Sequence, residues 1–199
     1  MKRITVLIVA MTSFVLLAPT MRAAVITFIA GDETVGLSSP VAVPITVNGF
    51  TDVTTVQFTL EWDSAVIQYL SVGNFVLPGM TASSFGTGEA AAGTLTVSWD
   101  DPDILGETLS SGAKIFDINY ISAGSAGLTD VSFTGSVVPL EVTTRVGDDF
   151  IVQDFVGSPG SVNVVPEPIN IALGVFAGLF VGATTLRWVF KKRAPQTAS

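Results

Sequence analysis

The sequence predicts an all-β fold, a two-sheet antiparallel β-sandwich of the jelly-roll type with about nine strands. Apolar residues alternate with other residues over short stretches, the first being Val41, Val43, Ile45 and Val47. A period of two places one set of side chains on the buried face of a half-buried strand. Turn-forming residues separate these stretches, and no convincing helix lies within residues 25–165. This spacing favours a sandwich over a parallel α/β fold.

The expected strands follow one another through a single domain of about 140 residues, an ordinary domain size. A second clear alternation runs from Val56 to Trp62, and later ones include Trp99, Phe116 and Val131. Turn signals between them are Asn48-Gly49, Pro78-Gly79, Gly86-Thr87-Gly88 and Gly147-Asp148. We expect strands near 25–30, 41–47, 54–62, 66–72, 94–99, 114–122, 129–135, 139–145 and 149–156, with a final one at 161–165.

Residues 1–24 have the pattern of a secretory signal peptide. Lys2 and Arg3 form a charged start, and the run from Ile4 to Ala18 is mostly apolar. Small residues at 23 and 24 offer a cleavage site, although the residues three positions earlier are not small. We expect cleavage there, with an uncleaved N-terminal anchor as the alternative.

Residues 169–190 form an apolar segment at the other end of the chain. At about 1.5 Å per residue, its length suffices for a helix that crosses a bilayer. Its one charged residue is Arg187, and the basic cluster of Lys191, Lys192 and Arg193 follows it. The positive-inside rule then predicts a transmembrane helix with a cytoplasmic tail. The alternative is a buried core helix of a soluble domain.

The domain between these two ends is strongly acidic. Residues 25–165 contain Lys114 and Arg145 as their basic residues, against sixteen acidic ones. The formal charge is therefore 2 − 16 = −14 for the domain, compared with −8 for the whole chain. Such a surface repels nucleic acid and anionic lipid, and it attracts cations or basic partners. Nucleic-acid binding is thus excluded as a function.

The whole chain contains neither cysteine nor histidine. A disulfide framework, a thiolate metal site, a Ser-His-Asp triad and imidazole metal ligands are all excluded. Glycoside hydrolysis needs only two carboxylates about 5–10 Å apart across a cleft. Its nominal candidates are Glu61, Glu89, Glu107 and Glu141. Nothing in their spacing pairs them, so we expect a protein without enzymatic activity.

Two acidic clusters are candidates for a cation site. Asp100, Asp101 and Asp103 come directly after the strand expected at 94–99, and residues 148–149 occupy another turn. Grouped carboxylates on loops can hold calcium, but this spacing does not match an EF-hand loop. Aspartates also form ordinary turns. We favour the turn interpretation, keep calcium as the weaker alternative and expect no resident cofactor.

Several stretches of the domain resemble the cohesin family. They are residues 56–69, residues 93–99 followed by 112–120, and the opening 31–35. The resemblance spans most of residues 25–165 and implies a cohesin-like sandwich, although residues 36–40 lengthen the first turn. It also implies a non-enzymatic module that binds a dockerin, a small calcium-dependent module that brings its own calcium, through one sheet face. The loop after Asp63 and the strand at 66–72 are candidate parts of that face.

The last segment, residues 166–199, resembles a PEP-CTERM sorting signal. Pro166, Glu167 and Pro168 match its tripeptide, and the basic cluster at 191–193 matches its end. This resemblance implies recognition by an exosortase-type membrane protease. It also implies an exported precursor anchored in the inner membrane of a Gram-negative bacterium, and later display at the cell surface or in the extracellular matrix.

A second hypothesis is a carbohydrate-binding module, because related sandwiches bind glycans. A structural component of the cell envelope or exopolysaccharide matrix is a third. Trp62 and Trp99 are the aromatic candidates for stacking on a sugar. Both continue an alternating apolar face, however, so we expect them to pack in the core.

Overall fold

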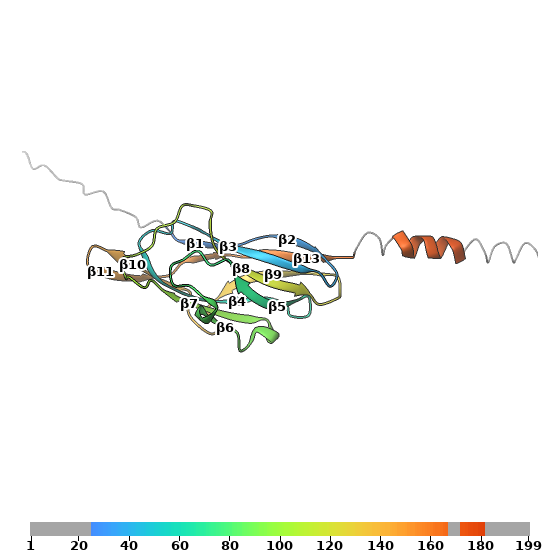
Figure 1. Cartoon of the computed structure of the whole chain (residues 1–199), viewed down its shortest axis with the longest axis horizontal. Helices are drawn as coiled ribbons and strands as arrows, with labels where there is room; N and C mark the ends of the chain where they lie inside the picture. The colour runs from blue at the N-terminus through green and yellow to red at the C-terminus, as the bar shows by residue number, and fades with distance from the viewer. Residues whose placement is uncertain (1–24, 167–171, 182–199) are drawn as a thin grey trace, which may run out of the picture.

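The computed structural model describes residues 25–166 and 172–181, and the first range forms a β-sandwich (Figure 1). Its two 3-10 turns are η1 (Ala82–Ser84) and η2 (Ala90–Ala92). Its strands are β1 (Thr27–Ala30), β2 (Glu33–Gly36), β3 (Pro40–Asn48), β4 (Val53–Glu61), β5 (Ile67–Gly73), β6 (Phe85–Gly86), β7 (Thr94–Asp100), β8 (Ala113–Ser122), β9 (Gly127–Thr134), β10 (Glu141–Val146), β11 (Asp149–Gln153), β12 (Val156–Ser158) and β13 (Gly160–Val165).

These strands form two sheets, which confirms the predicted two-sheet sandwich. The five-stranded sheet has the order β12-β1-β3-β8-β5. The eight-stranded sheet has the order β11-β10-β4-β9-β13-β2, and β7 pairs with β4 and with the short β6. Most pairs are antiparallel as expected. Two are parallel, β1 with β12 and β2 with β13.

The space between the sheets holds one apolar core. Its centre is a group of touching phenylalanine rings, Phe28, Phe58, Phe133 and Phe155. Burying a side chain of this size contributes roughly 1.5–3 kcal/mol each to folding. Every buried core residue of the described chain lies between Ile26 and Val164. The sandwich therefore has a complete core of its own, and residues 25–166 form a self-contained folding unit.

The first and last strands form a ribbon that crosses from one sheet to the other. β1 and β12 pair in the five-stranded sheet, and β2 and β13 pair in the eight-stranded sheet. The crossing requires close contact, because a Cβ atom at Gly160 would lie 2.2 Å from the carbonyl oxygen of Gly31. Only glycine fits there without moving a backbone. The prediction missed β2 and the two-residue β6, and it joined β11 and β12 into one strand at 149–156.

The C-terminal expectations fall partly outside the described residues. Residues 172–181 are helical, and no helix within the described residues is long and apolar enough to span a bilayer. The expected span at 169–190 therefore stays a prediction. Pro166 is exposed just after β13. The expected signal peptide at 1–24 and the remaining sorting residues, Glu167, Pro168, Lys191, Lys192 and Arg193, lie outside the described residues.

Candidate docking surface

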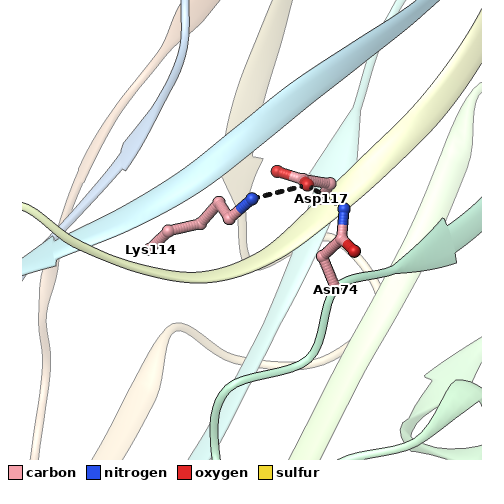
Figure 2. A network of polar contacts seen from close by, with 3 residues as sticks. All are labelled: Asn74, Lys114 and Asp117. Carbon is pink, nitrogen blue, oxygen red and sulfur yellow. Dashed lines mark hydrogen bonds and ion pairs between the residues drawn. The ribbon is translucent and has the colours of Figure 1, made fainter.

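The outer face of the five-stranded sheet carries a polar network that is satisfied internally. Asp117 is almost buried, and its Oδ2 accepts hydrogen bonds from Lys114 Nζ at 2.8 Å and from Asn74 Nδ2 at 2.6 Å (Figure 2). The Asp117 charge is therefore paired within the domain, whereas the Lys114 side chain stays 40% exposed. Strand β5, which contains most of the 66–72 region favoured from the sequence, is the edge of this sheet. Its register shifts between Tyr69 and Ser71.

The outer face of the eight-stranded sheet is instead rich in hydroxyl groups, although residues 137–138 cover Thr59 on it. Along β4, the core residues Val56 and Phe58 alternate with Thr55 and Gln57, which point outward. Thr55 donates a hydrogen bond to Thr143 on β10 over 2.8 Å. Gln57 lies opposite residues Ser98 on β7 and Glu141 on β10. The strands β10, β4 and β7 thus present a row of short polar side chains.

A hollow of about 580 Å³ lies at one end of this face. Its floor is formed by threonine side chains of β4 and β10, and apolar residues stand around it. The lining residues are Thr54, Thr55, Asp100, Asp101, Pro102, Ile104, Thr143 and Phe150. Ile104 and Phe150 are each more than half exposed. An apolar hollow next to a polar sheet face is the pattern of a recognition surface.

Ile104 stands in a strained backbone conformation at the rim of the hollow. Its φ is +57°, in the left-handed region that a β-branched residue rarely adopts. Its N–H donates to the carbonyl of Asp101, and its own carbonyl accepts a hydrogen bond from Arg145 Nη1 at 3.3 Å. Strain of this kind is retained where the surroundings impose it, and it is common at functional sites.

The acidic loop after β7 is organised by one of its own carboxylates. Asp101 is buried, and its Oδ2 accepts a hydrogen bond from the Gly106 N–H at 2.8 Å. Its Oδ1 accepts from the N–H of Asp103 at 3.3 Å. Within the described residues no group of three acidic side chains is placed to hold a metal ion. Asp101 and Asp103 therefore belong to a turn, whereas Asp100 ends β7 opposite Thr55, and the weaker calcium interpretation gains no support.

Other candidates from the sequence are placed as follows. Trp62 and Trp99 are both buried, which confirms the core assignment and removes them as sugar-stacking platforms. Trp99 donates from Nε1 to the Pro78 carbonyl at 2.7 Å. The nominal carboxylates are spread over different elements: Glu61 on β4, Glu89 before η2, Glu107 beside β4 and Glu141 on β10.

The comparisons with known proteins now decide the family. A family model described as the cohesin domain matches residues 27–152. The chain belongs to the cohesin family. A search of curated proteins finds no match. The family match ends within β11, whereas the cohesin structures below match a longer share of the chain.

Solved cohesin structures share the fold at low sequence identity. The seventh ScaB type I cohesin of Pseudobacteroides cellulosolvens has a TM-score of 0.60 at 14% identity, covering 71% of this chain and 92% of its own. The cohesin of the Coh-OlpA-Doc918 complex of Clostridium thermocellum has a TM-score of 0.58 at 14% identity, covering 71% of this chain and 99% of its own. A non-cellulosomal cohesin of the archaeon Archaeoglobus fulgidus has a TM-score of 0.51 at 16% identity, covering 75% of this chain and 97% of its own.

Sequence reasoning singled out Asp100 and Asp101 of this lining as cation-site candidates, but it missed Ile104 and Phe150. Ile104 and Phe150 lie far apart in the chain, and their meeting depends on how β10 and the loop after β7 pack. One signal was present: Phe150, Ile151 and Val152 are three consecutive apolar residues, whereas an alternating strand buries only every second one. Such a run also fits a strand that is buried on both faces, so the sequence alone did not identify it as exposed surface.

Proposed function

We propose that this cohesin-family chain is a non-enzymatic docking module that binds a dockerin-like module of a partner protein. The binding surface is the outer face of β10, β4 and β7, with the hollow at its end receiving an apolar side chain of the partner. The observation that carries this proposal is Ile104, which is held exposed beside the hollow in a strained conformation. A chain gains nothing in stability from such an arrangement, so a binding role explains it better.

The surface has the composition of a protein-protein interface. Exposed apolar anchors lie beside hydroxyl groups that can exchange hydrogen bonds, and such anchors commonly dominate binding energy. The acidic domain would attract a basic partner face and speed association at low salt. Related cohesin structures have been solved as complexes with dockerins, among them the CaDoc0917–CaCohA2 and Coh-OlpA-Doc918 complexes.

Titration of residues 25–166 with calcium-loaded dockerin modules from the same organism tests this proposal. We expect binding that is lost with a chelator, because the dockerin supplies the calcium. Ile104→Lys should raise the dissociation constant for the dockerin at least about tenfold, because it places a charge in the hollow. Leu70→Lys is the matched control, since Leu70 is similarly exposed on β5 of the other sheet. An effect of Leu70→Lys without one of Ile104→Lys would assign binding to the opposite face.

We further propose that the module is exported and displayed at the cell surface or in the extracellular matrix. The leader pattern at 1–24 and the PEP-CTERM-like segment at 166–199 support this proposal, with an exosortase-type protease as the sorting partner. Fractionation of cells that express the chain, with and without a substitution of Glu167, tests it. Equal distribution of both forms would argue against sorting at the tripeptide. Retention of residues 25–166 on the organism's exopolysaccharide would instead favour the glycan-binding alternative.

A further inference from the structure

The β11 strand is an unprotected sheet edge. It pairs with β10 over Asp149–Gln153 without a register shift, and β10 is its one neighbour among the described strands. Its side chains Phe150, Ile151 and Val152 are 52%, 47% and 59% exposed. Free backbone groups along an apolar edge are a template for a further strand.

The other described edges carry the usual protection. β12, β2 and β6 have only three, four and two residues. β5 is longer, but its register shifts between Tyr69 and Ser71, which interrupts a regular edge. β11 has neither a bulge nor a proline, and its one charged residue, Asp149, lies at its first position. Because natural sheets usually block such edges, its exposure calls for an occupant.

We propose that the occupant is β11 of a second copy of this chain, paired antiparallel about a two-fold axis at Ile151. Residues opposite one another in an antiparallel pair share a face of the sheet. With Ile151 opposite itself, Phe150 lies opposite Val152 of the partner subunit. Asp149 then lies opposite Gln153 of the partner subunit. This register pairs every apolar side chain with an apolar one and places no acid opposite an acid within the strands.

Neighbouring registers lack this complementarity. Centring the axis on Phe150 places Asp149 opposite the partner's Ile151, and centring it on Val152 places Phe150 opposite the partner's Asp154. A shift by a single residue would set outward side chains against inward ones. The register centred on Ile151 is thus selected by the sequence of the strand itself.

The proposed pairing has consequences for shape and for salt dependence. An axis perpendicular to the sheet keeps the outer faces of both eight-stranded sheets on one side, so the dimer carries two docking surfaces facing the same way. Asp148 lies opposite Asp154 of the partner subunit just beyond the paired strands, and each domain carries a formal charge of −14. Salt screens this repulsion, so the dimer strengthens as ionic strength rises.

Sedimentation velocity on residues 25–166 tests the proposal. Protein concentrations from about 10 μM to about 1 mM, at low and at high salt, cover the dissociation constants expected of a weak dimer. We expect a concentration-dependent dimer that salt strengthens. Ile151→Lys and Ile151→Glu should each raise the dissociation constant of the dimer at least about tenfold. Like charges of the two subunits then face each other at the two-fold axis. An equimolar mixture of the two variants should dimerise again, since the opposite charges pair.

The controls are Leu128→Lys and Leu128→Glu, because Leu128 is also an exposed apolar strand residue, 65% exposed on β9 and away from the β11 edge. They should leave the dimer unchanged, and circular dichroism should show that all variants fold. A wild-type monomer at all concentrations and salts would overturn the proposal. So would a mixture of the Ile151 variants that stays monomeric. Ile151 points to the face opposite the hollow, so dockerin binding by these variants remains a separate measurement.

Discussion

Asp32 and Ser161, 129 positions apart in the chain, are joined by two hydrogen bonds. Oδ1 of Asp32 accepts from both the backbone N–H and the side-chain hydroxyl of Ser161, each at 2.8 Å. The pair sits at the point where the ribbon of terminal strands crosses between the sheets. It therefore fastens the first strands to the last.

We expect Asp32→Ala to lower the free energy of unfolding by about 1–2 kcal/mol, because two charge-assisted hydrogen bonds are lost at a partly exposed site. Ser161→Ala removes only the hydroxyl donor and should cost about half as much. Urea unfolding followed by circular dichroism measures both. Equal costs for the two variants would show that the backbone N–H bond contributes nothing.

Removal of the last two strands should abolish folding, although the family match ends before them. Residues 25–152 lack β12 and β13. In the described sandwich β2 then loses its one partner strand, and Val162 and Val164 leave the core. We expect this fragment to show no cooperative thermal transition, whereas residues 25–166 unfold cooperatively. A sharp transition in the shorter fragment would contradict the role of the terminal ribbon.

Ile104→Gly should stabilise the domain while weakening docking. Glycine adopts a positive φ without strain, so the substitution removes the backbone strain at position 104. This gain should exceed the cost of glycine's greater entropy in the unfolded state by about 0.5–1 kcal/mol. The melting temperature should rise, and affinity for the dockerin module should fall because the apolar side chain is gone. Leu105→Gly is the control, since Leu105 is exposed with no positive φ and should not gain stability.

Alkaline pH should destabilise the domain through Tyr120. Burial, reinforced by the nearby Tyr69, raises the pKa of Tyr120 well above its ordinary value near 10. As pH rises, the hydroxyl loses its proton in the unfolded state before it does so in the folded state. The free energy of unfolding is therefore constant below about pH 10 and falls above it by about 1.4 kcal/mol per pH unit. Among the described residues Tyr120 Oη has no hydrogen-bond partner. Tyr120→Phe should therefore change stability little at pH 7 and flatten the alkaline decline seen in urea titrations.

The fold could be predicted where a strand buries one face and exposes the other. β3, β4, β7 and β8 all match the expected ranges within one or two residues, because alternation records that environment directly. β2 was missed because Val35 is its single buried residue, and one residue cannot show a period. β11 and β12 were merged because exposed apolar residues resemble a buried strand in sequence.

The docking surface could not be predicted for a different reason. Whether Ile104 is exposed depends on Arg145, 41 positions away, and on a carboxylate that folds the loop beneath it. Such contacts leave no periodic trace. The sequence led instead to the strand at 66–72, which the structure places at the edge of the other sheet.

The ribbon of terminal strands also sets the time at which the protein can fold. Among the described strands β2 pairs with β13 alone, and β13 begins at Gly160. A chain emerging from the ribosome or from a translocation pore therefore cannot close its sandwich until nearly the whole domain is free. Contacts between such distant residues also make closure slow. The domain thus stays unfolded, and hence able to pass through a narrow channel, for almost as long as it is being made.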